Sequence, residues 1–124
     1  MTEERKTYSP DEANAALPDV IPILEQLRDA QQTLSRLHDD VLESASGNGG
    51  GGPGREYLEA SNQAATAMKA LEEMGIEVRD PETGLIDFPA ERDGQTVYLC
   101  FRLGEDRVAW WHPPETGFAG RQPL

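Results

Sequence analysis

Apolar residues recur every three or four positions along the first third of the chain, which is the spacing of one face of an α-helix. The residues with this spacing are Val20, Ile21, Leu24, Leu27, Ala30, Leu34, Leu37 and Val41. Ahead of them, the run Ser9-Pro10-Asp11-Glu12 has the order of a capping box with proline at the first helical position. We therefore predict a helix over residues 9–46, with a break or kink near Pro18 because proline removes an interior N–H.

A second helix is predicted over residues 55–74, where a weaker apolar stripe appears before Gly75, a residue suited to the C′ position. Its members are Leu58, Ser61, Ala64, Ala65, Met68 and Leu71. Between the helices, residues 47–54 have the glycine-rich composition of a flexible loop. Two helices joined by so short a connection are expected to pack antiparallel as a hairpin.

After Gly75 the period changes from 3.6 to two, which indicates strands over residues 76–79, 85–90, 96–103 and 107–112. The tail, residues 113–124, is expected to be irregular because it contains three prolines and two glycines. The fold class is therefore α+β: a long antiparallel helical hairpin followed by a three- to four-stranded antiparallel meander and an irregular tail. We expect residues 1–124 to form a single domain.

Two turns set the predicted register of the meander. Asp93-Gly94 favours a two-residue type I′ turn that pairs Phe88 with Leu99. A second turn at residues 104–107 is expected to pair Phe101 with Trp110. One face then carries Ile86, Phe88, Val97, Leu99, Phe101, Leu103, Val108 and Trp110, and the other carries Leu85, Asp87, Tyr98, Cys100, Arg102 and Trp111.

Net charge restricts the classes of partner, and the cysteine count restricts the kinds of cross-link and metal site. The 124 residues include 11 basic and 23 acidic side chains, giving a net charge of −12. A nucleic-acid groove or an anionic membrane surface requires clustered Lys and Arg, so neither is expected as a partner. A single cysteine excludes an internal disulfide and a multi-cysteine zinc site. With no apolar segment after the charged N-terminal residues, the expected location is the cytoplasm.

Two motifs that superficially indicate chemistry have simpler interpretations. Residues 47–52 match G-x-G-x-x-G, but they follow a helix and lack the Lys-Ser or Lys-Thr of a phosphate-binding loop. Cys100, Glu105 and His112 are metal-ligand types, with Asp87 as a further oxygen donor. The predicted register places His112 on the face opposite Cys100, and no C-x-x-C or H-E-x-x-H motif is present. We therefore expect no metal and no cofactor.

Cysteine-based catalysis is also disfavoured. The predicted neighbour of Cys100 across the strands is Asp87, whose carboxylate opposes formation of a thiolate. A nucleophilic cysteine instead needs a base beside the thiol. We expect no catalytic residue.

The second sheet face is the candidate binding surface, because it combines aromatic side chains with an acid and bases. Its residues are Asp87, Tyr98, Cys100, Arg102 and Trp111, with Arg121 from the tail. The alternative is that the tail folds over this face, with Phe118 covering Trp111 and Arg121 pairing with Asp87. The sequence leaves both interpretations open.

Several segments together resemble an uncharacterised prokaryotic family, domain of unknown function 2203. They are residues 8–14 (YSPDEAN), 17–18 (LP), 50–54 (GGGPG), 84–90 (GLIDFPA), 97–100 (VYLC), 104–105 (GE), 111–112 (WH) and 117–121 (GFAGR). Phe101 stands where the family is expected to have tryptophan. The resemblance covers nearly the whole chain and implies no particular activity or catalytic residue.

We expect a non-enzymatic homodimeric interaction or scaffold module. The predicted first helix is longer than a compact domain of this size is wide, and its apolar stripe continues to the far end. A second hairpin is the natural cover, and Leu37→Glu is then expected to yield a monomer. A further protein partner is possible. The alternative is a small metal-dependent or ligand-binding enzyme that uses the face around Asp87, Cys100 and Arg102.

Overall fold

A computed structural model describes residues 6–46 and 54–124, with the side chains of residues 6–39 and 54–124 among them. The elements are α1 (Pro10–Ser46), α2 (Gly54–Glu73), β1 (Glu77–Asp80), β2 (Leu85–Arg92), β3 (Gln95–Arg102), β4 (Trp110–His112), the short 3-10 helix η1 (Phe118–Gly120) and β5 (Gln122–Pro123). Of the glycine-rich loop expected at residues 47–54, residues 47–53 lie outside the described residues, and Gly54 is the first residue of α2. The α+β class is confirmed, with two helices followed by an antiparallel sheet.

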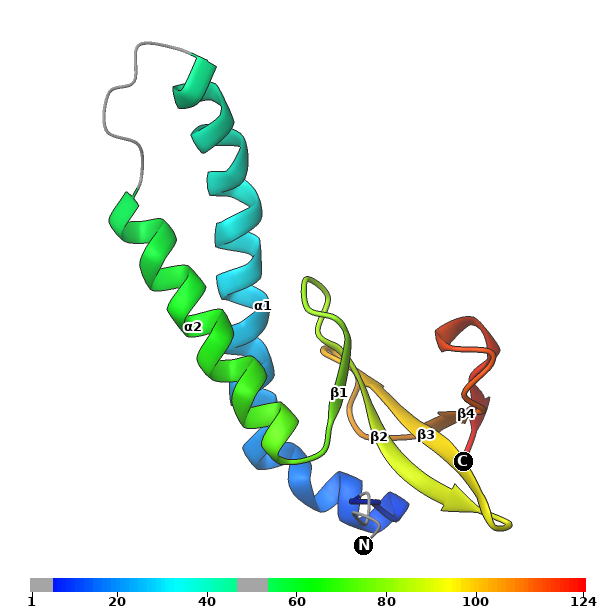
Figure 1. Ribbon diagram of the computed structural model, residues 1–124. Helices are drawn as coiled ribbons and strands as arrows, with labels where there is room; N and C mark the ends of the chain where they lie inside the picture. The colour runs from blue at the N-terminus through cyan, green and yellow to red at the C-terminus, as the bar shows by residue number, and fades with distance from the viewer. Residues whose placement is uncertain (1–5, 47–53) are drawn as a thin grey trace, which may run out of the picture.

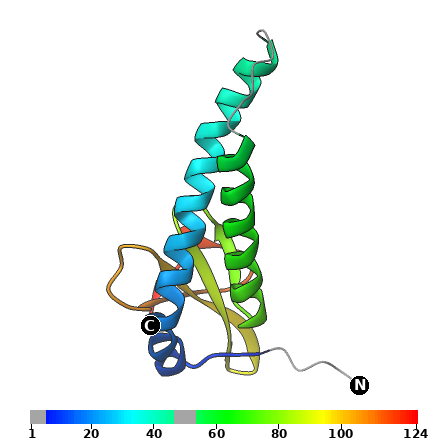
Figure 2. The same cartoon turned by 90° about the vertical axis from the view of Figure 1, so that its left-hand side faces the viewer.

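The capping box of α1 forms as its residue order predicts. The Ser9 N–H donates to Glu12 Oε1 at 2.9 Å, and the Glu12 N–H donates to Ser9 Oγ at 3.1 Å. These backbone and side-chain hydrogen bonds lower the pKa of Glu12. α1 then continues without interruption through Pro18 and Pro22. Of the two predicted outcomes, a kink is present and a break is not: the first turns of α1 lie at an angle to the rest of the helix (Figures 1 and 2), as is typical of proline within a helix.

α2 ends in a Schellman motif. The Gly75 N–H donates to Glu72 O at 2.9 Å and the Ile76 N–H donates to Leu71 O at 3.0 Å, while Gly75 has a φ of 78°. The side chains of α2 that face α1 are Ala60, Ala64, Ala67 and Leu71. The predicted stripe had included Leu58, Ala65 and Met68, which are exposed. The small alanines allow close approach of the two helices, so the larger residues are left on the outside.

The sheet is a single antiparallel meander in the order β1-β2-β3-β4-β5. The predicted pairing of β2 with β3 is confirmed, with Phe88 opposite Leu99 and Asp87 opposite Cys100. At the connecting turn, Asp93 and Gly94 have φ values of 53° and 78°. Both positive values belong to a type I′ turn, which is why local turn chemistry fixes this register.

The predicted register of β4 is wrong by one residue. Cys100, and not Phe101, lies opposite Trp110, and Tyr98 lies opposite His112. The physical reason is a competing partner for the connecting loop. The Val108 N–H donates to Asn14 Oδ1 at 2.8 Å, and Asn14 Nδ2 donates to Val108 O at 3.1 Å. The α1 side chain thus satisfies backbone groups that the predicted hairpin would have paired with β3.

The helices cover one face of the sheet and the C-terminal tail lies on the other (Figure 1). The core between helices and sheet is a single cluster that includes Leu17, Val20, Leu24, Leu27, Leu71, Ile86, Phe88, Leu99 and Phe101. The hairpin runs well beyond the sheet, so its far half has no sheet beside it (Figures 1 and 2). The 37 residues of α1 correspond to about 55 Å at 1.5 Å per residue.

Candidate functional site

The sheet face turned away from the helices, here called the outer face, brings together most of the predicted binding surface. Its residues are Asp87, Tyr98, Cys100, Arg102, Trp110 and His112. The one-residue shift of β4 places His112 and Trp110 on this face and removes Trp111 from it. Trp111 instead packs against the core, and the Arg92 guanidinium lies 4.4 Å from the centroid of its ring.

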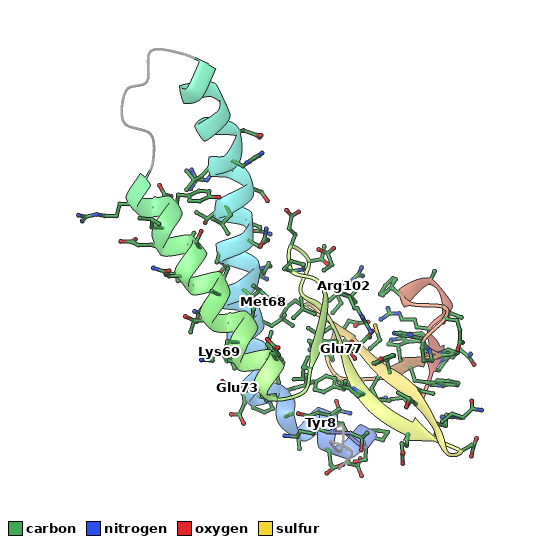
Figure 3. All side chains as sticks on the ribbon, viewed as in Figure 1. Tyr8, Met68, Lys69, Glu73, Glu77 and Arg102 are labelled. Carbon is green, nitrogen blue, oxygen red and sulfur yellow. The ribbon has the colours of Figure 1, made fainter. Side chains whose placement is uncertain are left out.

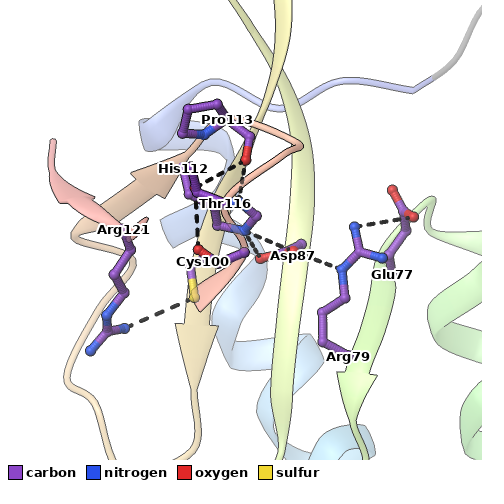
Figure 4. A network of polar contacts seen from close by, with 9 residues as sticks. Glu77, Arg79, Asp87, Cys100, His112, Pro113, Thr116 and Arg121 are labelled. Carbon is purple, nitrogen blue, oxygen red and sulfur yellow. Dashed lines mark hydrogen bonds and ion pairs between the residues drawn. The ribbon is translucent and has the colours of Figure 1, made fainter. Parts of the chain in front are cut away.

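A buried acid and a buried histidine meet on the outer face. Asp87 is 1% exposed and His112 is 2% exposed. His112 Nε2 lies 3.0 Å from both carboxylate oxygens of Asp87, and His112 Nδ1 lies 2.8 Å from Pro113 O. Figure 4 shows these contacts crossing the sheet from β4 to β2. Sequence reasoning missed this pair because it depends on the β4 register.

The hydrogen-bond partners of His112 restrict where its protons lie. Pro113 O can only accept, so Nδ1 carries a hydrogen. The contact between Nε2 and Asp87 then requires a second proton, held between the ring and the carboxylate. Arg79 favours its location on the ring, because Nε of this guanidinium donates to Asp87 Oδ2 at 2.8 Å and stabilises the ionised carboxylate. When both ring nitrogens carry a hydrogen, the contact between His112 and Asp87 is an ion pair in addition to a hydrogen bond.

A second arginine ties the tail to the outer face. Arg121 Nη1 forms an ion pair with Glu105 Oε2 at 2.9 Å and lies 3.9 Å from Cys100 Sγ. Its guanidinium stacks between the rings of Trp110, at 4.7 Å, and Phe118, at 4.2 Å. The expected pairs of Arg121 with Asp87 and of Phe118 with Trp111 do not form, because Arg79 and His112 already hold Asp87 and Trp111 faces inward.

The tail contributes structure that the sequence did not predict. Residues expected to be irregular include η1 and the strand β5, which pairs with β4 through Trp110–Pro123 and Trp111–Gln122. With the tail in place, Tyr98 is only 7% exposed and Cys100 is 1% exposed. Most of the candidate binding surface is therefore covered, and Arg102 remains exposed at its margin with its guanidinium 5.1 Å from the Phe118 ring.

The environment of Cys100 makes it a poor nucleophile. Burial and the neighbouring Asp87 carboxylate raise the pKa of its thiol to about 11, and the contact with Arg121 opposes the rise only in part. Since the thiolate is the reactive form, Cys100 is protonated at neutral pH.

Alkylation of the folded protein by iodoacetamide at pH 8 is therefore expected to be slow. A pKa raised from 9.0 to about 11 lowers the thiolate fraction about a hundredfold, and burial slows access further. The rate should rise with pH up to about 11. Mass spectrometry of samples with and without urea supplies the comparison, and equal rates in the two states would contradict this account.

The remaining chemistry of the face is limited. In the part of the chain that the structure describes, no group of three or more His, Cys, Asp or Glu side chains is placed to hold a metal ion. Glu105, one of the candidate metal ligands, forms an ion pair with Arg121. Its Oε1 also accepts a hydrogen bond from the Arg102 N–H at 2.7 Å. Asp87 and His112 do lie together, but both side chains are buried and hydrogen-bonded to each other. Among the described residues, these polar groups of the outer face contact one another and the tail.

An open surface lies on α2 instead. We define the α2 patch as Tyr57, Leu58, Ser61, Ala65 and Met68. Leu58 is 63% exposed, Met68 41% and Tyr57 39%. These are three of the five large hydrophobic residues that are exposed among the described residues, the others being Phe118 and Leu124. Leu58, Met68 and Tyr57 thus form an exposed apolar surface on one helix.

The fold and these surfaces define an α+β protein whose hairpin covers one sheet face and whose tail closes the other. A family model described as "Uncharacterized conserved protein (DUF2203)" matches residues 6–124. The chain belongs to this family. No curated protein and no solved structure matches it. Neither helix, over its described residues, is long and apolar enough to cross a membrane.

Proposed function

We propose that this protein is a homodimeric interaction module, and that a second copy covers its helical hairpin at the α2 patch. The observation that carries the proposal is the exposure of Leu58, Met68 and Tyr57 on one helix. Full burial of a side chain such as leucine or methionine is worth about 1.5–3 kcal/mol, so covering this patch supplies a driving force for association.

The shape of the hairpin supports a second hairpin as the cover. Its far end projects beyond the sheet (Figure 2), past the turn between β1 and β2, where Ser35 Oγ of α1 donates to Glu82 Oε1 at 2.6 Å. Two helices cover only part of an apolar stripe between them, whereas four helices enclose one. A two-fold pairing of identical hairpins closes on itself and leaves no repeating surface for further growth.

The patch also continues onto α1. Leu34 is partly buried against the core, and it borders a shallow depression shared with His38 of α1 and Tyr57 of α2. Leu37, by contrast, is 2% exposed and lies inside the hairpin. Its replacement would damage the fold itself, so Leu58 is the better residue with which to test association.

The wild-type protein is expected to be a dimer at micromolar concentration, and Leu58→Glu is expected to convert it to a monomer. The variant places a charge within the proposed interface, but because Leu58 is 63% exposed the substitution leaves the isolated chain intact. Size exclusion coupled to light scattering gives the mass of each. Leu124→Glu is the matched control, because Leu124 is also exposed but lies outside the patch. A monomeric wild-type protein would refute the proposal.

A further inference from the structure

We infer that the second copy binds α2 in the antiparallel direction, with the two-fold axis beside Gln63 and Ala64. This inference rests on the proposed dimer and adds its direction and its charged contacts. It follows from the order of four charged residues along α2 and from the position of the apolar residues among them.

The four charges are Arg55, Glu59, Lys69 and Glu73. All are exposed, and none forms an ion pair with another residue of the described chain. They lie on the side of α2 away from the alanine seam with α1. Figure 3 shows Lys69 and Glu73 following Met68 along this helix. These four side chains therefore have charge available for a partner.

Among these four residues, those at equal distances before and after Ala64 carry opposite charges. Glu59 lies five residues before Ala64 and Lys69 lies five residues after it. Arg55 lies nine residues before Ala64 and Glu73 lies nine residues after it. An antiparallel pair centred there brings Glu59 close to the partner's Lys69 and Arg55 close to the partner's Glu73. Each contact occurs twice because of the two-fold axis.

The apolar residues of the α2 patch are arranged symmetrically about nearly the same point of the helix. Leu58 lies five residues before Gln63 and Met68 lies five residues after it. An antiparallel pair therefore places Leu58 against the partner's Met68, while Ser61 and Ala65, two residues either side of Gln63, meet in the middle. Small residues at the centre allow the two helices to approach closely.

The parallel direction is disfavoured by the same residues. In a parallel two-fold pair every residue faces its own copy, so each of the four charges would face a like charge. The antiparallel direction also places the two sheets at opposite ends of the helix pair, since the sheet of each copy lies at the α2 C-terminal end (Figure 1).

Charge reversal tests the direction. Glu59→Lys and Lys69→Glu should each raise the dimer dissociation constant about tenfold at low salt, since each variant turns two attractive contacts into repulsive ones. The double variant Glu59→Lys/Lys69→Glu exchanges the signs and should return to within about threefold of wild type. Sedimentation equilibrium measures the constants. Glu91→Lys, an exposed charge reversal on β2, is the control for net charge and should leave the constant unchanged.

The outcomes separate the two proposals. A monomeric wild-type protein would refute the dimer and the direction together. A wild-type dimer whose double variant remains as weak as the single variants, or whose single variants bind like wild type, would overturn the antiparallel direction alone. Recovery in the double variant, with a difference between single variants and wild type that shrinks in high salt, supports it.

Discussion

Asp87→Ala is expected to lower the free energy of unfolding by about 1–3 kcal/mol, because it leaves the buried Nε2 of His112 without its hydrogen-bond partner. His112 is 2% exposed and would retain a proton-bearing ring facing an empty site. Arg79, whose side chain is 41% exposed, can instead turn to water. The loss should therefore arise mainly from His112, and urea denaturation at neutral pH measures it.

Two further variants identify the cause of that loss. Replacing both members by leucine removes the unpaired polar group, so Asp87→Leu/His112→Leu should be more stable than Asp87→Leu alone. Asp29→Ala is the surface control, since Asp29 pairs with Arg28 but its side chain is 65% exposed. Its cost should be below about 1 kcal/mol. If Asp87→Ala cost no more than Asp29→Ala, the buried pair would not contribute as described.

Phe88→Ala is the second large effect, with an expected cost of about 3–5 kcal/mol. Phe88 has no exposed surface and lies at the centre of the cluster between hairpin and sheet. Its ring meets that of Tyr8 edge-on, with centroids 5.0 Å apart and planes at 74°. Removing the ring leaves a cavity bordered by elements from both halves of the chain. These elements cannot fill the cavity without leaving their present packing positions.

Phe118→Ala is the matched control, since Phe118 is 37% exposed and lies on the tail. Thermal unfolding followed by circular dichroism should show a much larger decrease in midpoint for Phe88→Ala than for Phe118→Ala. Similar decreases would mean that the tail contributes to stability as much as the core does.

The predictable parts of this fold are those determined by neighbouring residues. The capping box at Ser9, the C′ position of Gly75 and the type I′ turn at Gly94 each depend on a few consecutive positions, and all three are found as predicted. The register of β2 with β3 follows directly from that turn. The hydrophobic period was sufficient for the helices and for the inner face of these strands.

The parts that could not be predicted depend on contacts between distant residues. The loop before β4 is held by Asn14, which lies 94 residues from Val108 in the chain, and no local pattern indicates that pairing. The resulting error in the predicted register of β4 placed His112 on the wrong face of the sheet. Its pairing with Asp87 was therefore not predicted from the sequence. On α2, alanine and leucine have similar apolar character in a sequence pattern, although Ala60, Ala64 and Ala67 are buried and Leu58 is exposed.

Tyr8 shows what joins the hairpin to the sheet. Its N–H donates to Pro89 O at 2.7 Å, its hydroxyl donates to Met74 O at 2.6 Å, and its ring packs on Phe88. One residue thus holds β2 and the end of α2 at fixed positions relative to the start of α1. Because these contacts tie three elements together at the base of the hairpin, a load on the helices reaches the sheet through Tyr8.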